Sequence, residues 1–207
     1  GKVFTDKVDL ELPGPLPLSW ERVYFSSSSY EGPLGHGWHH SYDLALCEDD
    51  EAIAVRLADG RPVAFPRLGQ GESYFERAER LTLTREPNGY ALVDSDGLRW
   101  RFAPLADTDI QPLVSVENRS GHHRISFEYD ERGFLRLIRD SGGRMLPVRT
   151  DDQGRIVEIK GPHPDDDQAD VVLLRYAYDR DGNLVEARDA LDHPMRFVYD
   201  GHQLVQE

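Results

Sequence analysis

Cysteine and basic side chains are scarce in this sequence. One cysteine cannot form a disulfide within the chain, so Cys47 is interpreted as a small packed residue of a protein made in a reducing compartment. The 38 acidic residues outnumber the 24 lysines and arginines, and the formal net charge is −14. Nucleic acid is disfavoured as a partner, because its binding depends on basic residues that neutralise phosphates. We interpret the acidic excess as a solubilising surface, with which a basic protein cargo would be compatible.

Long hydrophobic runs are also missing. No apolar stretch approaches the ~18 residues that a membrane-spanning helix needs, so no membrane span is expected in this chain. Residues 1–6 lack the architecture of a signal peptide. The proportions of charged (30%) and hydrophobic (39%) residues are ordinary for a soluble globular protein. The pattern predicts one short helix, over residues 74–80, and strands and turns elsewhere.

A regularly spaced turn pattern, Y-D-x-x-G, dominates the second half of the chain. Its members are Tyr129, Asp130 and Gly133; Asp151 and Gly154; Tyr178, Asp179 and Gly182; and Tyr199 with Asp200. The four aspartates are 21, 28 and 21 positions apart, and the polar segment 162–168 accounts for the longer interval. A fixed period of this length is typical of an array in which each unit buries its apolar face against its neighbours.

Each repeat is predicted to be a hairpin. Apolar and aromatic side chains alternate ahead of the turn, as in Leu174, Tyr176 and Tyr178, which indicates strands with one buried face. The aspartate can bind its own downstream backbone, and the glycine can adopt a positive φ. The regular spacing therefore assigns the aspartates to turns and not to pairs of catalytic carboxylates. Stacked hairpins would form one antiparallel ribbon.

The first half of the chain also has hairpin signals. Asn88-Gly89, Asp59-Gly60 and Asp96-Gly97 each separate two short apolar segments. The predicted fold class is therefore all-β, with antiparallel strands and hairpins. We divide the chain into an N-terminal β-rich region, residues 1–117, and a repeat array, residues 118–207. The array would hold three to four units, of which the last is truncated, and we expect the ribbon to continue past Glu207.

Two sets of motifs together resemble the Rhs family of bacterial polymorphic toxins. The Y-D-x-x-G turns are similar to the YD repeats of that family. The segments L-P-G-P-L-P-L at 12–18, R-V-Y at 22–24 and G-P-L-G-H-G-W-H-H-S-Y-D at 32–43 are similar to the opening of the Rhs core. In this order the motifs cover nearly the whole chain. The chain is thus identified as the N-terminal, opening part of an Rhs core.

The resemblance implies a β-strand shell, wound into a hollow cocoon, that encloses a C-terminal toxin until delivery, often by a type VI secretion machine. It implies no enzymatic activity, no catalytic residue and no cofactor in this chain. Expected partners are the remaining repeats of the core, the toxin domain, and the secretion apparatus through regions outside this chain. The protein would occupy the bacterial cytoplasm before export and would then be secreted or delivered into a target cell.

The opening motif contains the best candidates for metal chemistry: His36, His39, His40 and Asp43. Imidazole and carboxylate groups are donors that zinc accepts. In a strand, however, His39 and His40 point to opposite faces, so at most two of the three histidines could readily meet. The favoured interpretation is structural: Gly35 and Gly37 permit a tight backbone path, Trp38 anchors the core, and Tyr42 belongs to the same motif. A metal site at 36–43 is the second alternative.

The first alternative is a binding module. Aromatic side chains that faced outward could bind a carbohydrate or a protein, as in cell-surface proteins of the teneurin kind, which have repeats of the same type. The candidates are Tyr129, Tyr176, Tyr178, Tyr199, Phe127 and Phe197. Aromatic residues at alternating positions more often build the core of a ribbon, which is the interpretation we favour.

Overall fold

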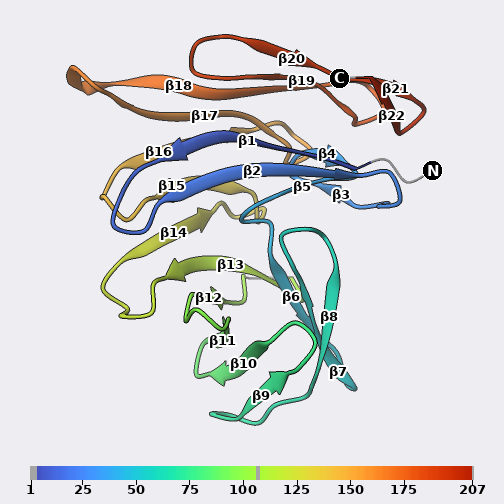
Figure 1. The fold of residues 1–207 in the computed structure, drawn as a ribbon, viewed down its shortest axis with the longest axis vertical. Coiled ribbons are helices and arrows are strands. Elements are labelled where there is room, and N and C mark those ends of the chain that lie inside the picture. The colour runs from blue at the N-terminus through green and yellow to red at the C-terminus, as the bar shows by residue number, and fades with distance from the viewer. Residues whose placement is uncertain (1–3, 106–107, 207) are drawn as a thin grey trace. The chain divides into compact units, whose positions relative to one another are not determined.

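The computed structural model describes residues 4–105 and 108–206, without the side chains of 167 and 168. Every regular element in this part of the chain is a strand, and neighbouring strands pair antiparallel (Figure 1). The prediction of an all-β, antiparallel fold is confirmed. Across the same residues, no helix has the length and apolar character needed to cross a membrane.

Packing divides the chain into two units. Residues 1–41 and 128–207 form the ribbon unit, and residues 42–127 form the middle unit. The ribbon unit is discontinuous because the opening segment packs on the last repeats and not on the residues that follow it. This division differs from the boundary at 117/118 that the motif spacing indicates, and the repeat boundary itself stays a prediction.

The ribbon unit combines a small sheet from the opening segment with the repeat hairpins. The opening strands are β1 (Phe4–Leu12), β2 (Leu18–Phe25), β3 (Glu31–Gly32), β4 (Gly35–His36) and β5 (Trp38–His40). The repeat strands are β15 (Leu135–Arg139), β16 (Met145–Thr150), β17 (Ile156–His163), β18 (Asp166–Tyr178), β19 (Leu184–Arg188), β20 (Pro194–Arg196), β21 (Val198–Asp200) and β22 (Gln203–Gln206). The order of one sheet is β1-β2-β5, and β15 to β20 pair in chain order. β3 pairs with β4, and β21 with β22.

The middle unit is a second set of hairpins. Its strands are β6 (Ala45–Glu48), β7 (Ala52–Arg56), β8 (Pro62–Pro66), β9 (Ser73–Glu76), β10 (Leu81–Glu86), β11 (Gly89–Val93), β12 (Arg99–Phe102) and β13 (Ile110–Glu117). β14 (Arg124–Tyr129) carries the chain from the middle unit into the ribbon unit. Strands β9 to β13 pair in chain order, and β13 also pairs with β6, which continues through β7 to β8. The three hairpin signals of the first half all lie between paired strands.

The repeat turns share one hydrogen-bonding scheme. The aspartate Oδ1 accepts the backbone N–H groups two and four residues further on, at 2.9–3.0 Å, in the turns that begin at Asp130, Asp140, Asp151, Asp179 and Asp189. The fourth residue has a positive φ, which glycine adopts without steric cost. Gly182, for example, has φ +84°, whereas the turn at Asp189 places Asp192 at φ +64°. The aspartate and the glycine thus complete the turn together.

Three expectations are wrong in detail. Cys47 was interpreted as a packed residue, but it is exposed on β6, because it follows the buried Leu46 and its side chain points to the opposite face of the strand. Residues 74–80 do not form a helix: β9 pairs with β10, and the backbone turns through Arg80 at φ +57°. Cross-strand pairing prevails there, because the backbone groups of Tyr74 and Phe75 find partners in Leu83 and Thr82 of β10. Asp200 also differs from the other repeat aspartates. It lies at the end of β21, opposite Gln203, so only two residues separate it from the returning strand.

Each unit has its own apolar core. In the ribbon unit the opening sheet contributes Trp20, Tyr24 and Trp38, all 0% exposed, and the repeats contribute side chains such as Ile159 and Leu184. The core of the middle unit contains Leu46, Ile53, Val55, Phe65, Leu83, Leu92, Phe102 and Leu113. In Figure 1 the blue strands β1 and β2 lie beside the ribbon strands of the second half.

Candidate functional site where the opening motif packs on the repeats

Three aromatic side chains of the opening sheet hydrogen-bond to the repeats. The indole Nε1 of Trp20 donates to the Tyr176 hydroxyl at 3.1 Å, and that of Trp38 donates to the Tyr199 hydroxyl at 2.9 Å. The Tyr24 hydroxyl donates to the carbonyl of His202 at 2.7 Å. Buried indoles and phenols need such partners. These bonds therefore fix the position of the opening sheet on the repeats.

The G-P-L-G segment of the opening motif binds the backbone of two repeat turns. Ile156 N–H donates to the carbonyl of Pro33 at 2.7 Å, and His36 N–H donates to the carbonyl of Gly182 at 3.1 Å. The Tyr178 hydroxyl donates to the carbonyl of Ile156 at 2.7 Å. The motif therefore adds main-chain hydrogen bonds where two hairpins end.

Gly35 and Gly37 are required by this close approach. Both have a positive φ, +83° and +72°. A Cβ atom on Gly35 would lie 2.3 Å from the carbonyl oxygen of Gly182, and one on Gly37 would lie 2.9 Å from the ring of Tyr24. Any side chain at Gly35 would therefore push the motif away from the repeat turn.

The earlier L-P-G-P-L-P-L segment contacts a third turn. Leu16 N–H donates to the hydroxyl of Ser141 at 2.9 Å, and this hydroxyl donates to the carbonyl of Leu16 at 2.6 Å. Arg144 donates to the carbonyl of Pro13 at 2.5 Å. Each part of the opening that carried the resemblance thus lies against a repeat.

The three histidines of the opening motif have separate neighbours. The rings of His36 and His202 stack with centroids 3.9 Å apart, and His36 Nδ1 lies 2.5 Å from a carboxylate oxygen of Glu31. His39 stacks on Tyr30, and His40 stacks on Trp20. Asp43, in the middle unit, forms an ion pair with Arg56 at 3.0 Å. Within residues 4–105 and 108–206, no three His, Cys, Asp or Glu side chains converge as metal ligands would.

The motif tyrosines that remain are half-buried. Tyr42, in the middle unit, packs its ring 4.9 Å from the ring of Phe127. Tyr129 lies at the end of β14, directly before the first repeat turn. Phe127, Tyr176 and Phe197 are each 4% exposed. The repeat aromatics therefore pack mainly into cores, as the favoured interpretation predicted, and do not gather in one exposed patch.

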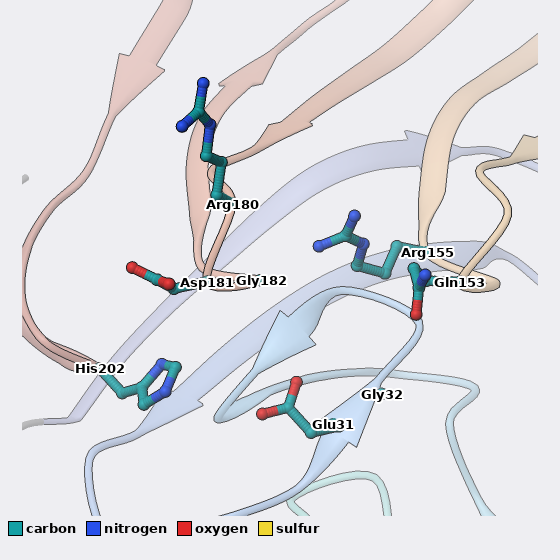
Figure 2. A pocket seen from close by; sticks show the side chains of 8 residues that line it. All are labelled: Glu31, Gly32, Gln153, Arg155, Arg180, Asp181, Gly182 and His202. Atoms are coloured by element: carbon teal, nitrogen blue, oxygen red, sulfur yellow. The ribbon is translucent and has the colours of Figure 1, made fainter.

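A polar pocket of about 440 Å³ lies beside this contact (Figure 2). It is lined by Glu31, Gly32, Gln153, Arg155, Arg180, Asp181, Gly182 and His202. Figure 2 shows the Glu31, Gln153 and His202 side chains between the opening motif and the turns, with Arg180 extended away from them. Arg155 is already engaged, because its Nε donates to Asp151 at 2.7 Å and its guanidinium lies over the ring of Tyr178. Glu31 is likewise engaged, by His36.

Burial changes the acidity of the repeat tyrosines. Desolvation raises the pKa of Tyr176 and of Tyr178 well above the ordinary value, and the carboxylates of Asp9 and Asp151 add to the respective shifts. Desolvation likewise raises the pKa of Tyr199. The three hydroxyls therefore stay protonated and donate hydrogen bonds.

Sequence reasoning missed two contributors to the contact. Arg22 is 1% exposed in the ribbon core, although arginine is rarely buried. The residue after three of the turn glycines was also overlooked: Arg144, Arg155 and Asn183 each donate a hydrogen bond back to the second oxygen of the turn aspartate. A recurring polar residue four positions after the aspartate was the available signal.

The chain is thus an all-β repeat segment in which the opening motif packs on, and hydrogen-bonds to, the repeat hairpins of the same chain. Residues 1–65 match a family described as Domain of unknown function (DUF6531). The chain is 29% identical over 214 residues to "Probable deoxyribonuclease RhsA" of Dickeya dadantii (strain 3937), which covers 100% of the chain and 14% of that protein. It is 30% identical over 249 residues to "Toxin protein Tse5" of Pseudomonas aeruginosa, covering 99% of the chain and 19% of that protein.

A third relative is "Double-stranded DNA deaminase toxin A" of Burkholderia cenocepacia (strain H111), 30% identical over 188 residues. That match covers 89% of the chain and 13% of the relative. The chain therefore spans only 13–19% of the length of these three relatives. The similarity extends over nearly the whole chain, and together these matches support an Rhs-type polymorphic toxin.

Proposed function

We propose that this chain is a non-catalytic wall segment of an Rhs toxin protein. In the whole protein it helps to enclose a C-terminal toxin before delivery, and the delivery route is type VI secretion. The wall is part of a curled β-cocoon, and its partners are the further repeats of the same core and the toxin domain. The protein is held in the bacterial cytoplasm until it is delivered.

One observation carries this proposal. The motif side chains and backbone groups that could have formed a site are used for packing within the chain. The turn carboxylates bind their own backbone, and the tyrosine hydroxyls bind the opening motif. A segment that satisfies the polar groups of its motifs within its own chain in this way is suited to form a wall and not to perform chemistry. The toxin names of the relatives are consistent with a cargo outside this segment.

Limited proteolysis of the natural full-length protein tests containment. We expect the C-terminal region to survive in the native protein and to be digested after denaturation. Free cleavage of that region in the native protein would contradict the proposal and favour an exposed binding surface.

A substitution in this chain tests whether the segment itself contributes to containment. Gly35→Val places a side chain against the carbonyl oxygen of Gly182, so we expect the C-terminal region to become cleavable. Gly142→Ala is the matched control, because the nearest atom to its added Cβ lies 3.4 Å away. Equal protection in both variants would show that the opening motif does not contribute to containment.

A further inference from the structure

Arg22 is a buried cation at the centre of the ribbon unit. Its guanidinium lies 4.9 Å from the ring centroid of Trp38 and 4.8 Å from that of Phe197. Aromatic rings interact with the flat faces of a guanidinium, whereas its N–H groups project from the edge in a planar fork. With both rings in place, hydrogen-bond acceptors can reach Arg22 only along that edge.

The protein supplies few acceptors along the edge. Nε donates to Asp9 Oδ2 at 2.6 Å, and Nη2 lies 3.0 Å from the sulfur of Met195. A thioether sulfur is a weak acceptor. Among residues 4–105 and 108–206, no acceptor is recorded for Nη1. Because these residues supply no acceptor for it, the Nη1 group can donate to an acceptor that enters from outside the chain.

A second cation lies directly opposite. Lys7 on β1 is the register partner of Arg22 on β2, so both side chains lie on the same face of the sheet. Within the described part of the chain, Lys7 takes part in no ion pair. Asp9 reaches Arg22 through a register shift between Val8 and Leu10. On this strand pair, Lys7 and Arg22 therefore lie near one carboxylate, that of Asp9.

Both cations line the same cavity of about 310 Å³. Its apolar lining comes from Val8, Leu174, Ala187, Pro194 and Met195. Two further charged side chains line it: Arg188 is paired with Glu186 at 2.6 Å, and Asp189 is a second carboxylate, 3.0 Å from the imidazole Nδ1 of His193. The cavity thus combines an unsaturated guanidinium fork, a free ammonium group and an apolar wall.

We propose that this cavity is a binding site for a carboxylate carried on a short apolar stem. The two oxygens of a carboxylate match the edge of a guanidinium fork, and Lys7 compensates the added charge. The stem contacts the apolar lining. The ligand is either the side chain or terminus of a polypeptide, or a free small carboxylic acid.

The test is titration of the chain with propionate, followed by the guanidinium Nε signal of Arg22 in NMR spectra. We expect a saturable shift with a Kd on the order of millimolar. Lys7→Glu should weaken binding by ~10-fold or more, because it reverses the free charge at the rim. Lys160→Glu is the matched control and should change the Kd by less than ~2-fold, since Lys160 lies on β17 and does not line this cavity.

Arg22→Lys tests the fork itself. It keeps the charge beside Asp9 but removes the planar donor edge, so we expect propionate binding to be lost while the chain still unfolds cooperatively. Because Arg22 is buried, this variant could fail to fold, and Lys7→Glu, at an exposed position, then decides the question.

Three peptide probes distinguish the sources of the carboxylate: one with a free C-terminus, its amide, and an amide with an internal glutamate. Binding of either carboxylate-bearing peptide but not of the plain amide assigns the site to a polypeptide. Binding of propionate alone assigns it to a small acid. The proposal is overturned if propionate gives no saturable shift, if Lys7→Glu and Lys160→Glu weaken binding equally, or if inorganic phosphate binds more tightly than propionate.

Discussion

The ribbon unit and the middle unit are both built from antiparallel hairpins, but their cores differ in how far apart in the sequence the contacting residues lie. In the ribbon unit, hydrogen bonds between buried side chains connect residues far apart in sequence, such as Trp20 with Tyr176 and Trp38 with Tyr199. In the middle unit the corresponding side-chain bonds are closer in sequence, such as Tyr90 with Glu48. The first core needs both ends of the chain, whereas the second is complete within residues 42–127.

The difference bears on how the two regions reach their folds. Contacts between residues close in sequence cost less loop-closure entropy and form earlier than contacts of large separation. The middle unit can therefore form before the opening sheet meets the repeats. The ribbon hairpins have locally determined turns, but their apolar face stays open until β1, β2 and β5 cover it.

Deletion of residues 1–41 has the largest expected effect. It removes Trp20, Tyr24 and Trp38, so the ribbon hairpins lose the side chains that cover their apolar face. We expect hydrogen-exchange protection to be lost in β15 to β19 and retained in β10 to β12. Mass spectrometry of exchanged peptides measures both regions in one sample. Protection of the repeats without the opening segment would mean that the two cores do not differ as described.

Tyr178→Ala should have the next largest effect. Its ring lies under Arg155 and its hydroxyl binds a backbone carbonyl, so we expect a loss of ~3–5 kcal/mol in the free energy of unfolding. Tyr178→Phe should lose ~1 kcal/mol, the contribution of a typical hydrogen bond. Tyr74→Ala in the middle unit is the control. Tyr74 is 44% exposed, and we expect a change within ~0.5 kcal/mol in urea unfolding.

Two turns of the ribbon unit allow a reciprocal test. Gly182→Ala should destabilise the chain by ~1–2 kcal/mol, because the positive φ disfavours a side chain. The nearest side-chain atom to the new Cβ would be 3.5 Å away, so the effect is conformational and not a clash. Asp192→Gly should stabilise by up to ~1 kcal/mol, because it removes the same strain and costs only exposed ion pairs. Thermal unfolding of the two variants should shift in opposite directions.

Alkaline pH should destabilise the ribbon unit more than the middle unit, and this difference is the smallest of the expected effects. Burial raises the pKa of Tyr176, Tyr178 and Tyr199 in the ribbon unit, and raises that of Tyr90 in the middle unit to about 12. A tyrosine whose folded pKa exceeds its unfolded value, ~10, contributes stability that is present below pH ~10 and is lost as the pH rises further. We expect exchange protection in the ribbon unit to weaken first, and Tyr178→Phe to reduce that loss. Equal weakening in both units would contradict this expectation.

Much of the fold could be predicted from local signals. Alternation of apolar residues indicates strands because successive side chains point to opposite faces, and the aspartate and glycine of each turn act within five residues. The segment 74–80 was predicted incorrectly because pairing with β10 depends on a partner strand that a local pattern does not contain. Asp200 followed the repeat spacing, yet its hairpin is closed by a shorter turn.

The candidate site was predictable in its residues but not in its contacts. The opening motif indicated that Gly35, Gly37 and Trp38 are structural, but no local pattern related Gly35 to Gly182 or Trp38 to Tyr199. The burial of Arg22 was also not predictable, because it depends on rings that come from β5 and from the segment between β20 and β21. The contacts of Gly35 with Gly182, of Trp38 with Tyr199 and of Arg22 with Phe197 join residues more than a hundred positions apart, and a single sequence does not encode them in any short pattern.

The sequence by itself determined the strands, the turns, the repeat period and the absence of an internal disulfide, because each depends on residues close together or on composition. The tertiary structure decided which side chains the repeats bury, which opening residues cover them, and where a cation is left without a full set of acceptors. The physical reason is that burial and hydrogen-bond satisfaction depend on every group brought within a few ångströms, whatever its position in the chain.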